Sequence, residues 1–180
     1  MSVIYVVGPS GAGKSALCKK LAEQGTHFIH VSLDAQVKRY AGVAHLNEIV
    51  HLPDGWAKFW NYCLQALHQI CQIKDDNIYL VDAGAGSLQT EQGRNYFIER
   101  AKNLVCVTGN EDVIYGRNSV KIQVRGDLRS KDDFMKTEYS PERRAVYEAA
   151  QYAVNTTKLD LNASLHTFQE VISAILQHAD

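Results

Sequence analysis

The sequence lacks the features that mark membrane-bound, secreted and nucleic-acid-binding proteins. No apolar run approaches the ~18 residues that a membrane span needs. No basic segment precedes the apolar run at 3–7, as it would in a signal peptide. The net charge is −1, without the clustered Lys and Arg that binding to a phosphate backbone requires. We therefore expect a cytoplasmic protein whose partners include neither a membrane nor a nucleic acid.

The sequence also lacks the spacings of a redox motif or a zinc site. Its four cysteines are scattered and form no C-x-x-C pair, and its histidines do not have zinc-site spacing. Reduced, mostly buried thiols are expected from this pattern.

The size and composition are those of one ordinary globular domain. The chain has 180 residues, of which 46% are hydrophobic and 22% charged. A chain of this length buries about 70% of the surface that its unfolded form exposes. It contains no repeat, no low-complexity tract and no linker, so we expect a single domain over 1–180 that is a monomer or a weak homodimer.

One stretch points directly to a ligand. Residues 8–15 read Gly-Pro-Ser-Gly-Ala-Gly-Lys-Ser, follow the apolar run at 3–7 and precede a helix-like run at 16–22. Strand, glycine-rich loop and helix are the context that makes G-x-x-x-x-G-K-[ST] a phosphate site, because backbone N–H groups and the helix N-terminus surround the anion. The alternative, a glycine-rich turn without a ligand, is disfavoured by that context. The residues predicted to bind ATP here are Gly11, Ala12, Gly13, Lys14, Ser15 and Ala16.

Two of these residues have further predicted roles. Lys14 reaches the β- and γ-phosphates and is a candidate catalytic residue, and Ser15 is placed to ligate Mg²⁺. ATP and Mg²⁺ are therefore the expected cofactors.

The remaining apolar runs predict an α/β fold. Strands are expected at 3–7, 27–32, 77–82, 103–108 and, more weakly, 152–156. Helical spacing separates them, notably at 54–73, 89–101, 109–118, from Ser140 onward and at 164–178, while 43–53 is irregular. This alternation predicts a three-layer α/β/α P-loop NTPase fold with a five-stranded parallel sheet, whose ligands bind at the carboxyl ends of the strands.

Polar residues follow two of those strand ends. Asp34 comes just after the second strand, where it could orient or deprotonate an acceptor hydroxyl, or serve as a helix N-cap. Asp82 ends the third strand, where it could hold Mg²⁺ in the manner of a Walker-B acid or bond the loop that follows. Gly84 and Gly86 permit a ligand near the backbone, or make a flexible turn.

Two further segments could complete a site. Lys58 and Trp60 lie at the start of the predicted helix 54–73, whose apolar stripe is otherwise typical of core. Residues 119–138 are polar and charged without a regular apolar period. They are expected to form a mobile lid that brings an arginine over the transferred phosphoryl group, or else a solvated loop.

With these elements assigned, the chain resembles the shikimate kinase family of P-loop kinases over nearly its whole length. The most distinctive match is Glu142-Arg143-Arg144-Ala145-Val146-Tyr147-Glu148, which is similar to the family's E-R-x-P-L-Y-E run. The resemblance implies that Arg143 binds the acceptor's carboxylate and that Asp34 contacts its hydroxyls. It also implies an acceptor-binding segment at Gly84-Ala85-Gly86, a catalytic lid arginine at Arg125 and an adenine-stacking arginine at Arg117.

The departures from the family pattern lie mostly on the acceptor side. Ser32 stands where the family has a second Asp, and Trp60 where it has an arginine that helps to clamp the carboxylate. Lys58 could replace that arginine as a point charge, although not as a bidentate fork. Ala85 replaces the middle glycine, and Gly126 replaces the lid's proline. We also hypothesise that Asp82 takes over a Mg²⁺–water contact that Ser32 no longer makes.

The sequence therefore predicts an ATP-dependent kinase of a hydroxyl on a small metabolite, shikimate or a related polyhydroxylated acid. Two alternatives stay open. One is a kinase of another acceptor, such as a gluconate-type sugar acid, a nucleoside or nucleotide, or an antibiotic. The other is a nucleotide-binding regulatory protein with weak hydrolysis.

Overall fold

The computed structural model describes residues 2–25, 27–123, 130–157 and 160–178. Within them, five strands form one parallel sheet in the order β2-β3-β1-β4-β5. The strands are β1 (Ser2–Val7), β2 (Phe28–Ser32), β3 (Ile78–Asp82), β4 (Leu104–Thr108) and β5 (Tyr152–Asn155). The five predicted strands are confirmed, each to within one residue at either end.

The helices alternate with the strands along the chain. They are α1 (Lys14–Gln24), α2 (Leu33–Ala41), α3 (Asn47–Val50), α4 (Gly55–Gln72), α5 (Glu91–Ile98), α6 (Glu111–Gln123), α7 (Lys131–Glu138), α8 (Pro141–Ala149) and α9 (Leu161–Gln177). Two short 3₁₀ turns, η1 (Ala85–Leu88) and η2 (Ala101–Asn103), precede and follow α5.

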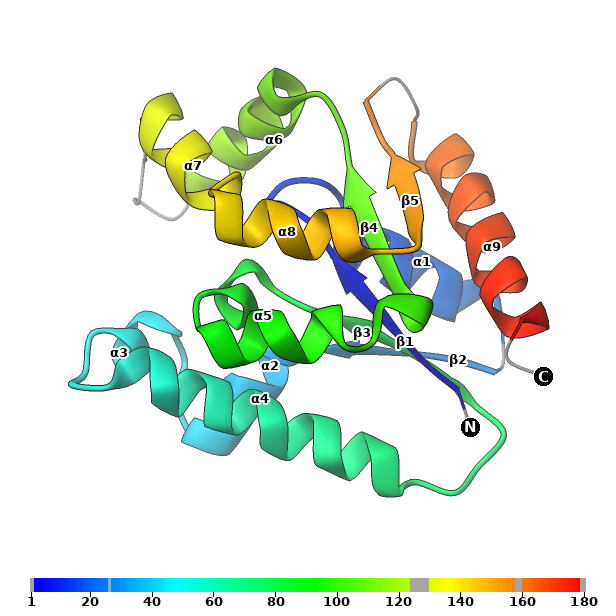
Figure 1. The fold of residues 1–180 in the computed structure, drawn as a ribbon, viewed down its shortest axis with the longest axis horizontal. Coiled ribbons are helices and arrows are strands. Elements are labelled where there is room, and N and C mark those ends of the chain that lie inside the picture. The colour runs from blue at the N-terminus through cyan, green and yellow to red at the C-terminus, as the bar shows by residue number, and fades with distance from the viewer. Residues whose placement is uncertain (1, 26, 124–129, 158–159, 179–180) are drawn as a thin grey trace.

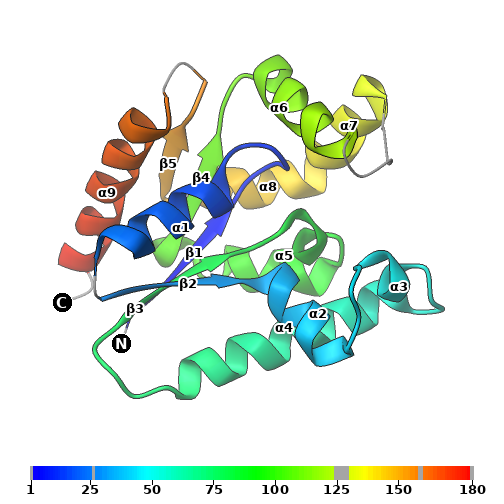
Figure 2. The ribbon, with the colours of Figure 1, turned by 180° about the vertical axis from the view of Figure 1, so that it is seen from behind.

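The central strand β1 explains why the fold has three layers. Successive side chains of a strand point to opposite faces, and all of Ile4 to Val7 are buried. Ile4 and Val6 pack into the core beneath α1 and α9, whereas Tyr5 and Val7 pack into the core beneath α4, α5 and α8. Figures 1 and 2 show these two groups of helices on opposite faces of the sheet. The predicted three-layer α/β/α fold is confirmed.

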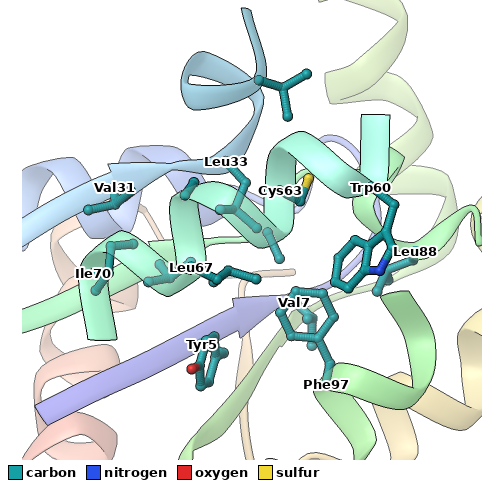
Figure 3. Packing of buried hydrophobic residues seen from close by; sticks show 14 of the residues in the cluster. Tyr5, Val7, Val31, Leu33, Trp60, Cys63, Leu67, Ile70, Leu88 and Phe97 are labelled. Atoms are coloured by element: carbon teal, nitrogen blue, oxygen red, sulfur yellow. The ribbon is translucent and has the colours of Figure 1, made fainter. Parts of the chain in front are cut away.

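Helix α4 contributes more buried residues than any other helix to the core that contains Tyr5 and Val7. Its buried residues include Phe59, Trp60, Cys63, Leu67 and Ile70, which recur at three- and four-residue spacing. Figure 3 shows several of them above β1, with Phe97 of α5 beside Trp60. The prediction that this stripe is core is confirmed. The predicted thiol burial also holds for Cys18, Cys63 and Cys106, whereas Cys71 is exposed and all four are free.

Three segments differ from the prediction. The helix expected at 109–118 continues through Gly116 to Gln123, because one glycine costs a helix only about 1 kcal/mol. A single helical turn, α3, interrupts the irregular segment 43–53. Residues 131–138 form a helix with Phe134 fully buried, so the solvated-loop interpretation is wrong for them. Residues 124–129, in the middle of the predicted lid, lie outside the described residues.

Candidate active site

The glycine-rich loop Gly8–Ser15 connects β1 to α1 at the carboxyl edge of the sheet. Gly8, Gly11 and Gly13 all have positive φ, a conformation that favours glycine. Gly8 is the most constrained, because a Cβ there would lie 2.0 Å from the carbonyl oxygen of Val107 in β4. A Cβ on Gly13 would meet nothing within 4 Å, so open space lies beside the N-terminus of α1. The positive-φ glycines and the open space at the helix N-terminus are the features that a loop binding the phosphates of ATP uses.

Lys14 lies inside this loop. Its side chain is buried, and its Nζ donates hydrogen bonds to the carbonyl oxygens of Gly8 at 2.8 Å and Pro9 at 3.0 Å. The next two residues, Ser15 and Ala16, are exposed on the first turn of α1. A helix's first N–H groups have no intrahelical partner. The predicted phosphate-binding residues thus come together at one point.

Asp82 lies beneath the loop at the end of β3. Its side chain is almost fully buried, 3.8 Å from His30 Nε2, and its Oδ1 has no hydrogen-bond partner among the described residues. Burial raises the pKa of a carboxyl group, but His30 and the Lys14 ammonium outweigh it and hold the pKa of Asp82 below its ordinary value. The Ser15 hydroxyl also lowers the pKa of Asp82. Asp82 is therefore a buried carboxylate beside the phosphate loop.

This arrangement fits a Mg²⁺ ion. A buried, ionised oxygen without a partner and a neighbouring serine hydroxyl are the oxygen ligands that Mg²⁺ uses together with phosphates and water. The described residues hold no cluster of three or more His, Cys, Asp or Glu side chains that could bind a metal by itself. The residues that would hold Mg²⁺ are Ser15 and Asp82. When bound there, the ion would neutralise charge on the phosphates.

Asp34 follows β2, the strand that neighbours β3, and lies in the first turn of α2. The cap of that helix is Ser32, whose Oγ accepts a hydrogen bond from the Ala35 N–H. The N-cap interpretation of Asp34 is therefore wrong. The Asp34 carboxylate instead lies against Gly84, because a Cβ on Gly84 would be 2.2 Å from Asp34 Oδ1. Asp34 and the Gly84–Gly86 segment are thus brought together.

The Gly84–Gly86 segment is not a flexible turn. It enters η1, where the Ser87 hydroxyl donates to the Gly84 carbonyl oxygen at 2.7 Å. A Cβ on Gly86 would lie 2.8 Å from the ring of Phe59. Ala85 and its two glycine neighbours are half-buried. The backbone of this segment is therefore hydrogen-bonded and packs against α4 and Asp34.

Lys58 and Trp60 do not join this group. Lys58 is exposed, and its side chain makes no hydrogen bond or ion pair with any described residue. Trp60 is buried, with its ring 5.6 Å from Tyr96 and 6.2 Å from Phe97 of α5. The hypothesis that Trp60 borders the acceptor is wrong, because the broad apolar stripe of α4 turns it into the core between α4 and α5. It lines a separate 470 Å³ cavity on that side.

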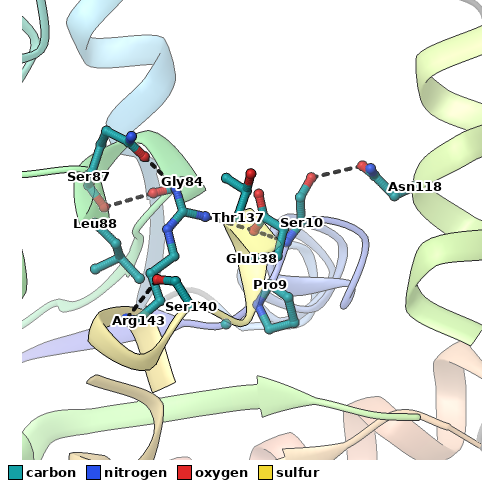
Figure 4. A network of polar contacts seen from close by, with 12 residues as sticks. Pro9, Ser10, Gly84, Ser87, Leu88, Asn118, Thr137, Glu138, Ser140 and Arg143 are labelled. Carbon is teal, nitrogen blue, oxygen red and sulfur yellow. Dashed lines mark hydrogen bonds and ion pairs between the residues drawn. The ribbon is translucent and has the colours of Figure 1, made fainter. Parts of the chain in front are cut away.

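Arg143 is at the centre of a buried polar network (Figure 4). Its Nη1 lies 3.0 Å from Glu138 Oε2, and its Nη2 donates to Gln89 Oε1 at 2.9 Å. The same Glu138 oxygen accepts a hydrogen bond from the Ser10 N–H of the phosphate loop at 3.0 Å. The Ser10 hydroxyl bonds Asn118 Oδ1 at 2.9 Å. The network therefore joins the phosphate loop to the residue predicted to bind the acceptor.

A cavity of about 580 Å³ lies on the other side of the loop. It is lined by Gly11, Ala12, Gly13, Leu17, Arg117, Val120, Thr156, Asp160, Leu161 and Ser164. Arg117 is held at its wall by two hydrogen bonds to Thr156, from Nη1 to Oγ1 and from Nη2 to the carbonyl oxygen. Thr156 in turn lies against the loop, with Oγ1 3.0 Å from the Ala12 carbonyl oxygen. The cavity adjoins the phosphate cradle, as a site for the base of ATP must.

The sequence reasoning missed Glu138, Asn118, Gln89 and Thr156. Thr156 directly follows β5, so inspecting every strand end would have found it. Glu138 had no such signal, because it lies in a segment without a visible helical period. Arg125, the predicted lid arginine, lies outside the described residues.

We compared this chain with known protein families and with solved structures. Residues 10–179 match the protein family described as shikimate kinase. The chain belongs to the shikimate kinase family. Because the match covers nearly the whole chain, the shikimate kinase resemblance is confirmed. This member of the family is an ATP-dependent small-molecule kinase.

Solved structures of shikimate kinases share the fold. The enzyme from Acinetobacter baumannii was solved in complex with shikimate and is 20% identical in sequence to this chain. The two structures align with a TM-score of 0.73 over 99% of this chain and 94% of the other chain. The enzyme from Bacteroides thetaiotaomicron is 20% identical with a TM-score of 0.71 over 96% and 98% of the two chains. The enzyme from Aquifex aeolicus is 19% identical with a TM-score of 0.67 over 98% of both.

A comparison with curated proteins found no match. Among the described residues, no helix has both the length and the apolar character that crossing a membrane requires.

Proposed function

We propose that this protein transfers the γ-phosphoryl group of ATP to a hydroxyl of a small polyhydroxylated acceptor, of the size and class of shikimate. The observation that carries the proposal is the meeting of the phosphate loop with Asp34, Gly84 and Arg143 at one edge of the sheet. A protein that only bound nucleotide would have no need of a carboxylate and an arginine on that side.

Each residue has a proposed role in an in-line transfer. Lys14 and the N–H groups of Gly11–Ala16 bind the phosphates and offset charge on the group in flight. Asp34 orients the acceptor hydroxyl and takes its proton as the new P–O bond forms. Arg117 and Thr156 bound the base cavity. We propose that Mg²⁺ is held by Ser15 and Asp82.

The acceptor is held on the side of Asp34 that faces away from the ATP phosphates. Gly84, Ala85 and Gly86 let it approach the backbone, and Arg143 bounds the end away from the reacting hydroxyl. Residues 119–138, which include the predicted lid arginine Arg125, close over the transferring group in this proposal, and the chain acts as a single domain. Holding both substrates in line supplies much of the rate, because phosphoryl transfer depends mainly on positioning and electrostatics.

The test is acceptor-stimulated release of ADP. The purified protein is supplied with ATP and Mg²⁺ and assayed with shikimate, a gluconate-type sugar acid, nucleosides and an aminoglycoside antibiotic, with phosphorylated products identified by mass spectrometry. We expect at least one polyhydroxylated acceptor to raise ADP release, and Lys14→Ala to abolish the increase. ADP release that no acceptor changes, together with tight nucleotide binding, would instead identify a nucleotide-binding regulator.

A further inference from the structure

Thr156 is a buried residue that contacts three separate parts of the proposed ATP site. It directly follows β5 and is only 4% exposed. Its Oγ1 lies 3.0 Å from the carbonyl oxygen of Ala12 in the phosphate loop and 3.2 Å from that of Thr108 at the end of β4. The same Oγ1 lies 3.0 Å from Nη1 of Arg117 in α6. One hydroxyl therefore joins the loop, the sheet and the wall of the base cavity.

The chemistry of these partners fixes the role of the hydroxyl. A carbonyl oxygen can only accept a hydrogen bond, and a guanidinium nitrogen can only donate one. The single proton of the Thr156 hydroxyl therefore goes to a carbonyl oxygen, and a lone pair of Oγ1 accepts from Arg117. Thr108 already accepts a hydrogen bond from the Thr156 backbone N–H at 2.8 Å, and Ala12 is the nearer carbonyl group, so the hydroxyl donates to Ala12. The residue at this position has to donate and accept at once, which a valine side chain cannot do.

Arg117 depends on Thr156 for its orientation. Besides the bond from Nη1, its Nη2 donates to the Thr156 carbonyl oxygen at 2.8 Å. Within the described part of the chain, the Arg117 side chain makes no other hydrogen bond and no ion pair, so its charge stays available to a ligand. A planar guanidinium that is held at both terminal nitrogens keeps one orientation. Thr156 therefore fixes the plane of a cation at the wall of the base cavity.

We propose that Thr156 is a positioning residue for ATP, which holds the Arg117 guanidinium in the orientation that the base requires. The bond to Ala12 anchors the hydroxyl, and the hydroxyl anchors Arg117. This inference rests on the proposed function, in which the cavity receives the base of ATP. Thr156 acts through Arg117 on the base of the nucleotide and leaves the grip on the phosphates to the loop.

The first experiment measures calorimetric binding of a non-hydrolysable ATP analogue with Mg²⁺. Thr156→Val keeps the shape of the side chain but removes the hydroxyl, so we expect about tenfold weaker binding, the scale of one hydrogen bond to a charged group. Thr156→Ser keeps the hydroxyl and should restore most of the affinity. Thr167→Val makes the same change on α9, where the hydroxyl donates to the Ala163 carbonyl oxygen within the helix, and should leave the affinity unchanged. Undiminished binding by Thr156→Val, or equally weak binding by Thr156→Ser, would overturn the inference.

Two measurements separate an effect on the base from an effect on the phosphates. In an Arg117→Ala background, Thr156→Val should weaken binding of the analogue by less than about twofold further, because both changes act on one contact. Inorganic tripolyphosphate carries the phosphates without a base, and its inhibition constant in a displacement assay should be the same for Thr156→Val and the wild type. Additive losses, or a parallel weakening of tripolyphosphate, would show that Thr156 acts on the loop and would refute its action through Arg117.

A second variant keeps the inference testable if Thr156→Val does not fold. Arg117→Lys retains the charge but cannot bond both Thr156 oxygens with a planar fork. Its affinity for the ATP analogue should therefore also fall by about tenfold. Wild-type affinity in Arg117→Lys would show that the orientation held by Thr156 is not needed. Thermal melting verifies that each variant is folded.

The outcomes separate this inference from the proposed function, because none of the binding measurements needs an acceptor. The expected binding pattern without transfer to any acceptor would refute the kinase proposal alone. Where transfer occurs, Thr156→Val should raise KM for ATP by about the same tenfold and leave kcat nearly unchanged. Transfer with an unchanged KM for ATP in Thr156→Val would refute the role of Thr156 alone.

Discussion

Replacing Gly84 by alanine should displace Asp34 without straining the backbone. The φ and ψ of Gly84 are −56° and 155°, which any residue can adopt, so the added methyl group is the whole perturbation. That methyl carbon would lie 2.2 Å from Asp34 Oδ1, 2.4 Å from Cγ and 2.5 Å from Oδ2. Since Cβ atoms are not found within 3.0 Å of other heavy atoms, the carboxylate must retreat by at least about 0.8 Å.

A displacement of this size has a predictable kinetic cost. Moving a catalytic group by about 1 Å can lower the rate about 100-fold, which corresponds to roughly 2.7 kcal/mol of transition-state stabilisation. We expect Gly84→Ala to lower kcat/KM for the acceptor by this order. The affinity for ATP should change little, because the phosphate loop lies on the other side of Asp34. Steady-state ADP release and calorimetric binding of an ATP analogue measure the two quantities.

Two further variants test the reasoning. Gly116→Ala places a methyl group in open space on α6 and should leave turnover unchanged. In the double variant Gly84→Ala/Asp34→Asn, the loss of kcat/KM should be no greater than in Asp34→Asn alone, because both changes act on the Asp34 carboxylate. Full activity of a folded Gly84→Ala protein, or fully additive losses, would refute the idea that Asp34 works from its position against Gly84.

The remaining predictions concern the buried carboxylate of Asp82 and the packing of helix α7. Asp82→Asn should raise the Mg²⁺ concentration for half-maximal turnover at least about tenfold; an unchanged Mg²⁺ dependence would exclude Asp82 from the metal site. Because the folded-state pKa of Asp82 is lowered, its stabilising contribution is present above its ordinary pKa and disappears as the pH falls through the folded value. Denaturant titrations from pH 6 down to pH 2, a range that spans the ordinary value of 3.8 and the region below it, should therefore show a smaller acid-induced loss of stability in Asp82→Asn than in the wild type. Phe134→Ala should lower the free energy of unfolding by about 3–5 kcal/mol, whereas the exposed Lys136→Ala should change it by less than about 0.5 kcal/mol. A loss below about 1 kcal/mol for Phe134→Ala would show that α7 is not packed as described.

The elements that the sequence predicts well are those whose signals are local. The run at residues 3–7 is apolar on both faces and is followed by a loop with three positive-φ glycines, so β1 and its phosphate loop could be identified without any knowledge of packing. Asp34 and Asp82 were identified because the carboxyl ends of parallel strands lie together at one edge of the sheet. Helix α4 was found because its stripe is long.

The features that were missed depend on tertiary contacts. Helix α7 has few apolar residues and is stabilised by Phe134 packing on α6, which no local pattern indicates. Glu138 was missed for the same reason, since a buried glutamate is found only when its arginine and its backbone donor are known. For Trp60 a place beside the acceptor stayed open as an alternative to the core, because its packing against α5 depends on an element thirty or more residues away in the sequence.

The place of β1 in the middle of the sheet has a consequence for how the protein folds. The first strand of the chain pairs with residues far along it, such as Ser2 with Ile78 and Tyr5 with Leu104. Gly8 completes its turn only against Val107. Long-range pairing of this kind is slow, because loop-closure entropy must be overcome before the contacts form. The turn of the nucleotide cradle at Gly8 therefore depends on β4, about a hundred residues further along the chain. ATP then binds only the assembled state and stabilises the fold as a whole.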